Sequence, residues 1–143
     1  MTQEQQVSFV ADIVYLYMAL SMVDDDQTYL EKNEAWACVE EWGELVQADS
    51  SALHKGWDRA QDRIAEHGCT GTMLDACVKA MSNLDSEILG ILLNDFVRIA
   101  IVDGRIYENE KDFCNWVARS FRLPEPFDYE LSPGAKYAIV RPG

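Results

Sequence analysis

The sequence predicts an all-α fold, and three observations support this class. All four prolines lie beyond residue 123, so no proline interrupts a helix in the preceding body. Apolar residues in that body recur at helical spacing, and capping residues or glycines separate the runs. With 48% hydrophobic residues, the 143-residue chain can close one sizeable core. We therefore expect one helical domain over residues 1–123, followed by a non-helical tail over 124–143.

The first two helices are predicted on either side of an aspartate-rich turn. Residues 7–23 place apolar side chains at helical intervals and form the first helix. The second helix starts near Tyr29, because the sequence from Thr28 to Glu31 has the form of a capping box. Its apolar residues then fall on one stripe, which predicts a buried face.

The third and fourth helices are shorter and more amphipathic. Asp49 or Ser50 can cap a third helix that runs to about Glu66, where Gly68 supplies a C-terminal stop. A fourth helix is predicted from about Thr72.

The fifth and sixth helices complete the predicted domain. Residues 86–102 are apolar almost all round, which is typical of a helix surrounded by others. The sixth helix spans roughly 108–121, and Pro124 marks its end. We expect the first and fifth helices to form the centre of the bundle, and the tail to lie extended against it or to trail from it.

The charge of the chain limits its partners. Asp and Glu number 25 against 12 Lys and Arg, which gives a formal net charge of −13. Nucleic-acid binding through phosphates needs clustered basic residues, so it is not expected here. We expect the partners to be cations or a basic protein surface. The sequence leaves open whether the chain forms a homodimer.

The acidic charge is concentrated near the N-terminus. The first fifty residues contain 11 acids and one base, Lys32. Glu40, Glu41 and Glu44 on the second predicted helix extend this acidic surface, and we predict that they bind a basic partner with electrostatic steering. The alternative for each of the three is a solvated helix face.

Membrane and export signals are absent from the printed sequence. No run of 18 apolar residues is free of charge, and no basic region precedes the first apolar stretch. We expect no membrane insertion and a cytoplasmic location. The four cysteines are accordingly expected to be reduced.

Two parts of the chain repeat one plan. In each, an apolar helix ends in Val-Asp, a short turn follows, and a Glu appears seven residues after the Asp. VDDDQTYLE, from Val23 to Glu31, aligns with VDGRIYENE, from Val102 to Glu110, without a gap. This pattern indicates an internal duplication in which the first two helices correspond to the last two.

With these repeats the sequence resembles the TerB-like family, the small helical domains of tellurite-resistance proteins that also occur at the N-terminus of a membrane-anchored DnaJ-type co-chaperone. The family signature is an Asp-Gly turn, an apolar position, a small capping hydroxyl and a Glu that opens the next helix. Asp103, Gly104, Ile106 and Glu110 match this signature. Tyr107 stands in place of the hydroxyl in this second repeat.

The first repeat follows the signature less closely. Asp24, Thr28 and Glu31 match it, whereas Asp25 replaces the glycine and Gln27 the apolar residue. The resemblance covers most of residues 1–123 and implies a multihelical TerB-like bundle associated with tellurite or general stress resistance. It also implies that the matched acidic positions hold a divalent cation.

A physical argument for a cation site stands beside the resemblance. Asp24, Asp25, Asp26 and Asp103 fall at the ends of apolar helices, where the helix dipole disfavours negative charge by roughly 0.3–1 kcal/mol. Calcium, magnesium or manganese would offset this cost through carboxylate and carbonyl oxygens, and zinc is a further candidate. We predict that Asp24, Asp25 or Asp26 binds the cation with Glu31, and that Asp103 binds it with Glu110. Whether the two turns share one ion stays open.

Other interpretations of these residues remain open. Glu31 can be the returning half of the capping box, Glu110 can favour a helix N-terminus, and the aspartates can form a solvated turn. An EF-hand is excluded, because its first two ligand positions would be Ile99 and Ile101.

The remaining candidate residues favour structural roles. Cys38 and Cys114 fall in or beside apolar stripes, and the four tryptophans lie at helical spacing among apolar residues, so core positions are predicted. The two histidines, with Cys69 and Cys77, lack a second pair at zinc-ligand spacing. No catalytic motif occurs, and we expect a non-catalytic module that binds a divalent cation. The alternative is a protein-interaction or immunity-like inhibitor module whose acidic face docks a basic partner.

Overall fold

The computed structural model consists of six helices in the described parts of the chain, which are residues 2–22, 29–102, 104 and 108–127. The prediction of an all-α fold is confirmed at this level. In chain order the helices are α1 (Gln3–Met22), α2 (Tyr29–Leu45), α3 (Ser50–His67), α4 (Gly71–Met81), α5 (Ser86–Ile101) and α6 (Glu108–Ser120).

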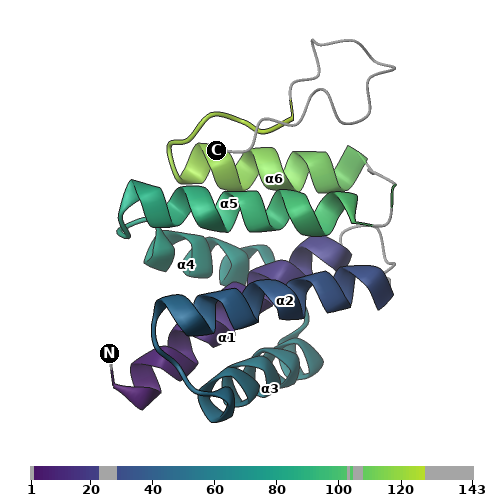
Figure 1. Ribbon diagram of the computed structural model, residues 1–143. Coiled ribbons are helices and arrows are strands. Elements are labelled where there is room, and N and C mark those ends of the chain that lie inside the picture. Colours follow the sequence, from purple (N-terminus) through teal and green to yellow (C-terminus); the bar gives the residue numbers. More distant parts are fainter. Residues whose placement is uncertain (1, 23–28, 103, 105–107, 128–143) are drawn as a thin grey trace.

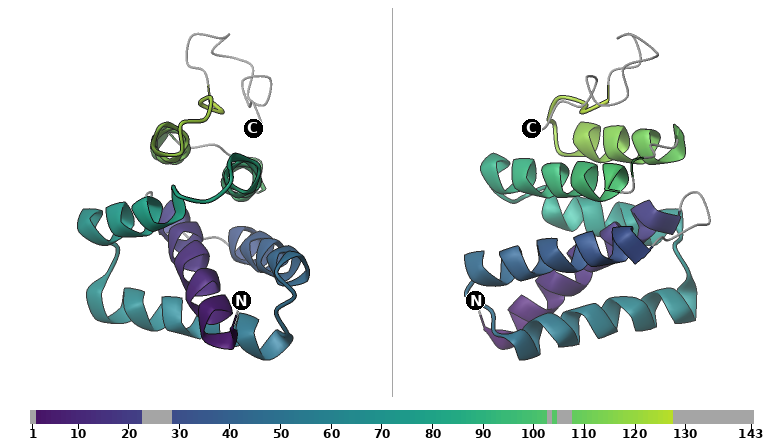
Figure 2. Two further views of the ribbon diagram at one scale, coloured as in Figure 1. Left: turned by 90° about the vertical axis from the view of Figure 1, so that its left-hand side faces the viewer. Right: turned by 45° about the vertical axis from the view of Figure 1, so that its right-hand side comes forward.

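Helix α1 is the centre of the bundle. It contacts each of the other five helices (Figure 1), and the two views of Figure 2 place it between α2, α3 and α4, with α5 and α6 stacked at one end. Its buried positions face every direction round the helix, from Val7 to Ser21. The central role predicted for this apolar helix follows from this lack of a polar face.

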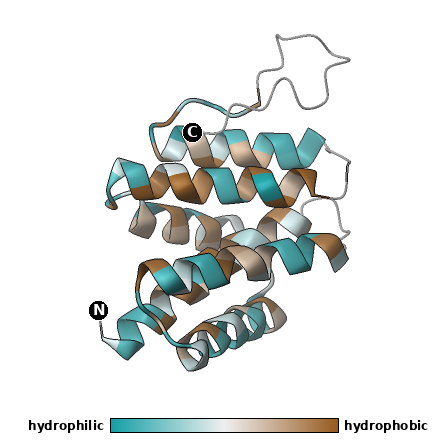
Figure 3. Cartoon of the chain, viewed as in Figure 1, coloured by the Kyte–Doolittle hydropathy of each residue, from teal (hydrophilic) through white to brown (hydrophobic). Residues whose placement is uncertain are grey.

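Helix α5 is central for only part of its circumference. It packs on α1, α2 and α6, and most of its apolar side chains are buried. Ile91, however, is 43% exposed, because no described helix covers that side of α5. Figure 3 shows the hydrophobic character of α5 beside the more hydrophilic outer turns of α2 and α3.

Capping residues set several helix ends, and those of α3 are the ones that the sequence predicts. The Asp49 side chain accepts a hydrogen bond from the Ala52 amide at 2.9 Å, and Gly68 ends α3 with a positive φ of 69°. Thr70 caps α4 and Asp85 caps α5 in the same way as Asp49. The start of α1 differs from prediction: Thr2 exchanges hydrogen bonds with Gln5, so the helix begins at Gln3 rather than residue 7.

The beginning of the predicted tail packs against the bundle. The Asn115 side chain donates to the Phe127 carbonyl at 2.8 Å and accepts from the Phe127 amide at 3.1 Å. Phe127 is 1% exposed and joins the core, so residues 124–127 are non-helical and docked on α6. The remainder of the tail, 128–143, lies outside the described residues.

The core positions predicted for the cysteines and tryptophans are partly confirmed. Cys38 and Cys114 are fully buried, and Trp42 and Trp57 are also buried. Trp36 and Trp116 are not: each is half-buried at the edge of the core. All four cysteines are free thiols.

Within the described residues, none of the helices combines the length and the apolar character that a membrane crossing requires.

Gly56 allows a close approach between helices α1 and α3. A methyl group at this position would lie 2.5 Å from Val10 Cγ1 and 3.1 Å from the Val7 carbonyl oxygen, so backbone as well as side chain would have to move. A methyl group at Gly90 on α5 would meet no atom within 4 Å. Substituting alanine at each of the two glycines therefore distinguishes the effect of packing from the effect of helix propensity.

We expect Gly56→Ala to lower the free energy of unfolding by about 1–3 kcal/mol through overpacking. Gly90→Ala should instead raise it by up to about 1 kcal/mol, because alanine favours helix and meets no neighbour. Urea denaturation of both variants measures the two effects. Equal stabilisation by both substitutions would contradict the close approach of α1 and α3.

Candidate functional site

The residues predicted to bind metal divide into two groups. Asp24, Asp25, Asp26 and Asp103 lie outside the described residues. Glu31 and Glu110 are described, and both are buried, with 2% and 1% exposure.

Glu31 and Glu110 have the same position within their helices. Each is the third residue of its helix, Glu31 in α2 and Glu110 in α6, and each therefore lies at a helix N-terminus where the dipole favours a carboxylate. Both also interact with other groups of the protein. Among the described residues, no group of three or more His, Cys, Asp or Glu side chains is arranged to hold a metal ion.

Arg98 on α5 neutralises part of the acidic surface of α2. Its guanidinium donates to Glu34 at 2.8 Å and to Glu41 at 3.0 Å. These hydrogen bonds, above all the one to Glu41, raise the pKa of Arg98, so its charge is permanent. Of the three glutamates predicted to bind a partner, Glu41 is thus engaged within the chain.

A buried acid lies directly behind this ion pair. Asp95 is 3% exposed, and its Oδ2 accepts hydrogen bonds from the Tyr17 hydroxyl and from the Trp42 indole, both at 2.7 Å. The indole N–H also reaches the Tyr17 oxygen at 3.1 Å. The network joins α1, α2 and α5, and Arg98 Nη1 lies 3.7 Å from the other Asp95 oxygen.

Burial controls the protonation of this network. It raises the pKa of Asp95 and raises that of Tyr17 well above its usual value, so the phenol remains a donor at neutral pH. Our sequence reasoning missed Asp95. The available signal was an acid three residues before an arginine, the only charged residues between 88 and 102 in an otherwise apolar helix.

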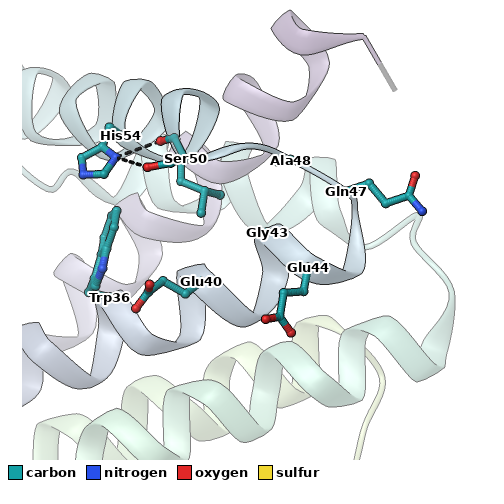
Figure 4. A pocket seen from close by; sticks show the side chains of 9 residues that line it. Trp36, Glu40, Gly43, Glu44, Gln47, Ala48, Ser50 and His54 are labelled. Atoms are coloured by element: carbon teal, nitrogen blue, oxygen red, sulfur yellow. Dashed lines mark hydrogen bonds between the residues drawn. The ribbon is translucent and has the colours of Figure 1, made fainter.

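A groove opens between α2 and α3, on the side of α2 away from Asp95. Its volume is about 590 Å³, and Figure 4 shows Trp36 and Glu40 rising from α2 beneath the imidazole of His54. We call it the α2–α3 groove. Its lining residues are Trp36, Glu40, Gly43, Glu44, Gln47, Ala48, Ser50, Leu53 and His54.

Local sequence shapes the walls of the α2–α3 groove. Gly43 lets the two helices approach, since a methyl group there would lie 2.8 Å from Leu53 Cδ1. On α3, His54 Nδ1 lies 2.8 Å from the Ser50 carbonyl oxygen, so this nitrogen carries the proton and donates. The His54 and Trp36 rings pack with centroids 4.8 Å apart.

A second hollow adjoins the groove across the Trp36–His54 ring pair. It measures about 260 Å³ and is walled by Trp36, His54 and Trp57, with Lys32 and Asn33 on α2 completing it. Trp36 meets Trp57 edge to face at 5.3 Å. We call it the aromatic hollow.

The charged rim of the groove is formed by Glu40 and Glu44. Both are exposed and lie one helical turn apart, a spacing that puts their Cβ atoms about 5–6 Å from each other. Within the described part of the chain, neither forms an ion pair, in contrast to Glu34 and Glu41.

A smaller polar cluster on α1, α3 and α4 is engaged within the chain. Arg63 pairs with Asp12 at 3.2 Å and lies over the Tyr15 ring, beside the Cys77 thiol. Burial raises the pKa of Cys77 to about 11, so the thiol is protonated at neutral pH and is a poor nucleophile. This arrangement does not supply an activated group for covalent catalysis.

Comparisons with known proteins give no family or relative from which a function could be inferred. No family model, curated protein or solved structure matches the chain.

We expect Asp95→Ala to lower the free energy of unfolding by about 2 kcal/mol or more. The buried Tyr17 hydroxyl loses its acceptor at roughly 1–3 kcal/mol, and the Trp42 indole keeps only its longer 3.1 Å contact with the Tyr17 oxygen. Asp95→Asn keeps one acceptor oxygen and should lose less. Chemical denaturation followed by far-UV circular dichroism measures both. Equal losses in the two variants would contradict the acceptor role of Asp95.

Proposed function

We propose that the protein is a non-catalytic acidic docking module of the TerB-like type, and that it binds a basic protein partner along α2. One observation carries this proposal: Glu40 and Glu44 are exposed on the rim of the α2–α3 groove, with no ion pair to any described residue. Glu34 and Glu41 on the same helix are already paired with Arg98.

The net charge supports the same function. A chain at −13, with 11 of its acids in the first fifty residues, attracts basic surfaces over distances of about one Debye length, roughly 10 Å at 0.1 M salt. Such steering raises association rates and gives them a salt dependence. The groove then supplies a concave surface beside the charge, which a merely solvated helix would lack.

We expect a fluorescein-labelled peptide of alternating lysine and serine to bind the protein at 50 mM NaCl and to bind more weakly at 300 mM. The double variant Glu40→Gln/Glu44→Gln should reduce its affinity about 5-fold, as the loss of two exposed charge contacts of about 0.5 kcal/mol each implies. Fluorescence anisotropy measures the affinity, with excess EDTA present to exclude metal-mediated binding.

The matched control is Asp58→Asn/Asp62→Asn on α3. Like the α2 variant, it removes two exposed acids that are four residues apart, so the two variants have equal net charge. Its two positions do not line the groove. A loss of affinity equal to that of the α2 variant would show that only total charge matters. Glu41 is left unchanged, because removing it would also break the pair with Arg98.

A divalent-cation module is the second candidate function. The observation that favours it is that Glu31 and Glu110 are both buried as the third residue of their helices, directly after the two acidic turns of the repeat. In this proposal they act with Asp24, Asp25, Asp26 and Asp103. The association of TerB-like proteins with tellurite or stress resistance, and a cytoplasmic location, belong to the same proposal.

We expect isothermal titration of chelator-treated protein to give a binding heat with at least one of Ca²⁺, Mg²⁺, Mn²⁺ and Zn²⁺. Asp103→Asn should weaken that binding while leaving the helical circular dichroism unchanged, because oxygen donors at the turn would be ligands rather than core residues. Absence of heat with all four ions would remove the metal function and leave the docking function intact.

A further inference from the structure

We propose that the α2–α3 groove and the aromatic hollow form one composite site for an extended basic peptide. An arginine of the peptide lies beside Trp36 and Glu40, with Glu44 one turn further along the groove, and an apolar residue two positions along occupies the aromatic hollow. This inference rests on the proposed docking function and specifies its ligand.

The composition of the groove selects a planar cation. Trp36 offers an indole one helical turn before Glu40, and Glu44 follows one turn further along the same groove. A guanidinium stacks on aromatic faces and hydrogen-bonds to carboxylates with its fixed fork, whereas a lysine ammonium acts as a point charge. The groove, at about 590 Å³, lies within the usual range of ligand pockets, about 300–1,000 Å³.

The composition of the aromatic hollow selects an apolar neighbour. Trp36, Trp57 and His54 wall a space of about 260 Å³, which is below the size of a typical ligand pocket and suits one side chain. Lys32 at this end repels a second cation. Lys32 at one end and the two glutamates at the other therefore fix the direction of the bound peptide, with its arginine toward Glu40 and Glu44.

The spacing of the two hollows favours an extended ligand. Both are lined by Trp36 and His54, whose ring centroids are 4.8 Å apart, so they are immediate neighbours. In an extended peptide, side chains two residues apart point the same way at about 6.6 Å. An Arg-x-Leu segment consequently presents both side chains to the composite site at once.

The ring pair itself is preorganised. His54 is held by its Nδ1 hydrogen bond to the Ser50 carbonyl oxygen, and Trp36 is held by its edge-to-face contact with Trp57. Groups that are already fixed lose little conformational entropy when a ligand binds. The Trp36 and His54 rings, which lie between the two hollows, thus need no rearrangement when the two peptide side chains bind on either side of them.

The test uses three labelled nonapeptides that differ only at the two positions: one with Arg-Ser-Leu at its centre, one with Gln-Ser-Leu and one with Arg-Ser-Ser. We expect the first to bind wild-type protein at least about 5-fold more tightly than either of the others, as cation–π and apolar contacts of about 1 kcal/mol each imply. Anisotropy measures the affinities. These arms need no protein variant.

Protein variants assign each preference to its hollow. Glu40→Gln/Glu44→Gln should reduce the preference for Arg over Gln to what the Trp36 ring alone supplies, and should keep the preference for Leu over Ser. Trp36→Leu should reduce both, and Trp36→Phe, which keeps an aromatic ring, should retain most of the binding. Circular dichroism checks the fold of each variant. At equal peptide concentration, the Trp36 indole signal in ¹H–¹⁵N spectra should shift most with the Arg-Ser-Leu peptide.

Two results would overturn the composite site in different ways. If all arginine peptides bind alike and Trp36→Leu changes nothing, the composite site is wrong while salt-dependent docking stands. If Glu40→Gln/Glu44→Gln affects no peptide, the docking function fails as well. Sedimentation showing a dimer that Trp36→Leu dissociates would assign the groove to a second copy of the chain instead.

Discussion

The arrangement of α2 depends on one buried carboxylate. Asp95 on α5 accepts hydrogen bonds from Tyr17 on α1 and from Trp42 on α2, both at 2.7 Å, and thereby joins these three helices. Because both donors are enclosed in the core, each needs an acceptor there. The network therefore fixes which residues of α2 face inward, and with them which residues face solvent.

The outer side of α2 acquires its chemical character from that orientation. Arg98, one turn after Asp95, pairs with Glu34 and Glu41 and removes them from the accessible charge. Glu40 and Glu44 lie along the α2–α3 groove. On one side of α2 the acids Glu34 and Glu41 are thus paired with α5. On the other side Glu40 and Glu44 are exposed, which supports our proposal of docking.

The two proposed functions place different demands on the acids of this protein. Docking uses exposed carboxylates beside an aromatic wall, where water is displaced only when a ligand arrives. A cation module would use Glu31 and Glu110, which are already enclosed at the N-termini of α2 and α6. Because the two sets share no residue, a protein of this type could have either property without the other.

The sequence by itself determined the helices, because their caps and apolar periodicity act over a few residues. Asp49 and Gly68 define α3 as predicted, and the helical class follows from the proline-free body. Only the tertiary structure decided which acids are paired and where concave surfaces form. The Arg98 pairs join residues 57 and 64 positions apart, and Trp36 meets His54 across two helices, so no local pattern encodes these contacts.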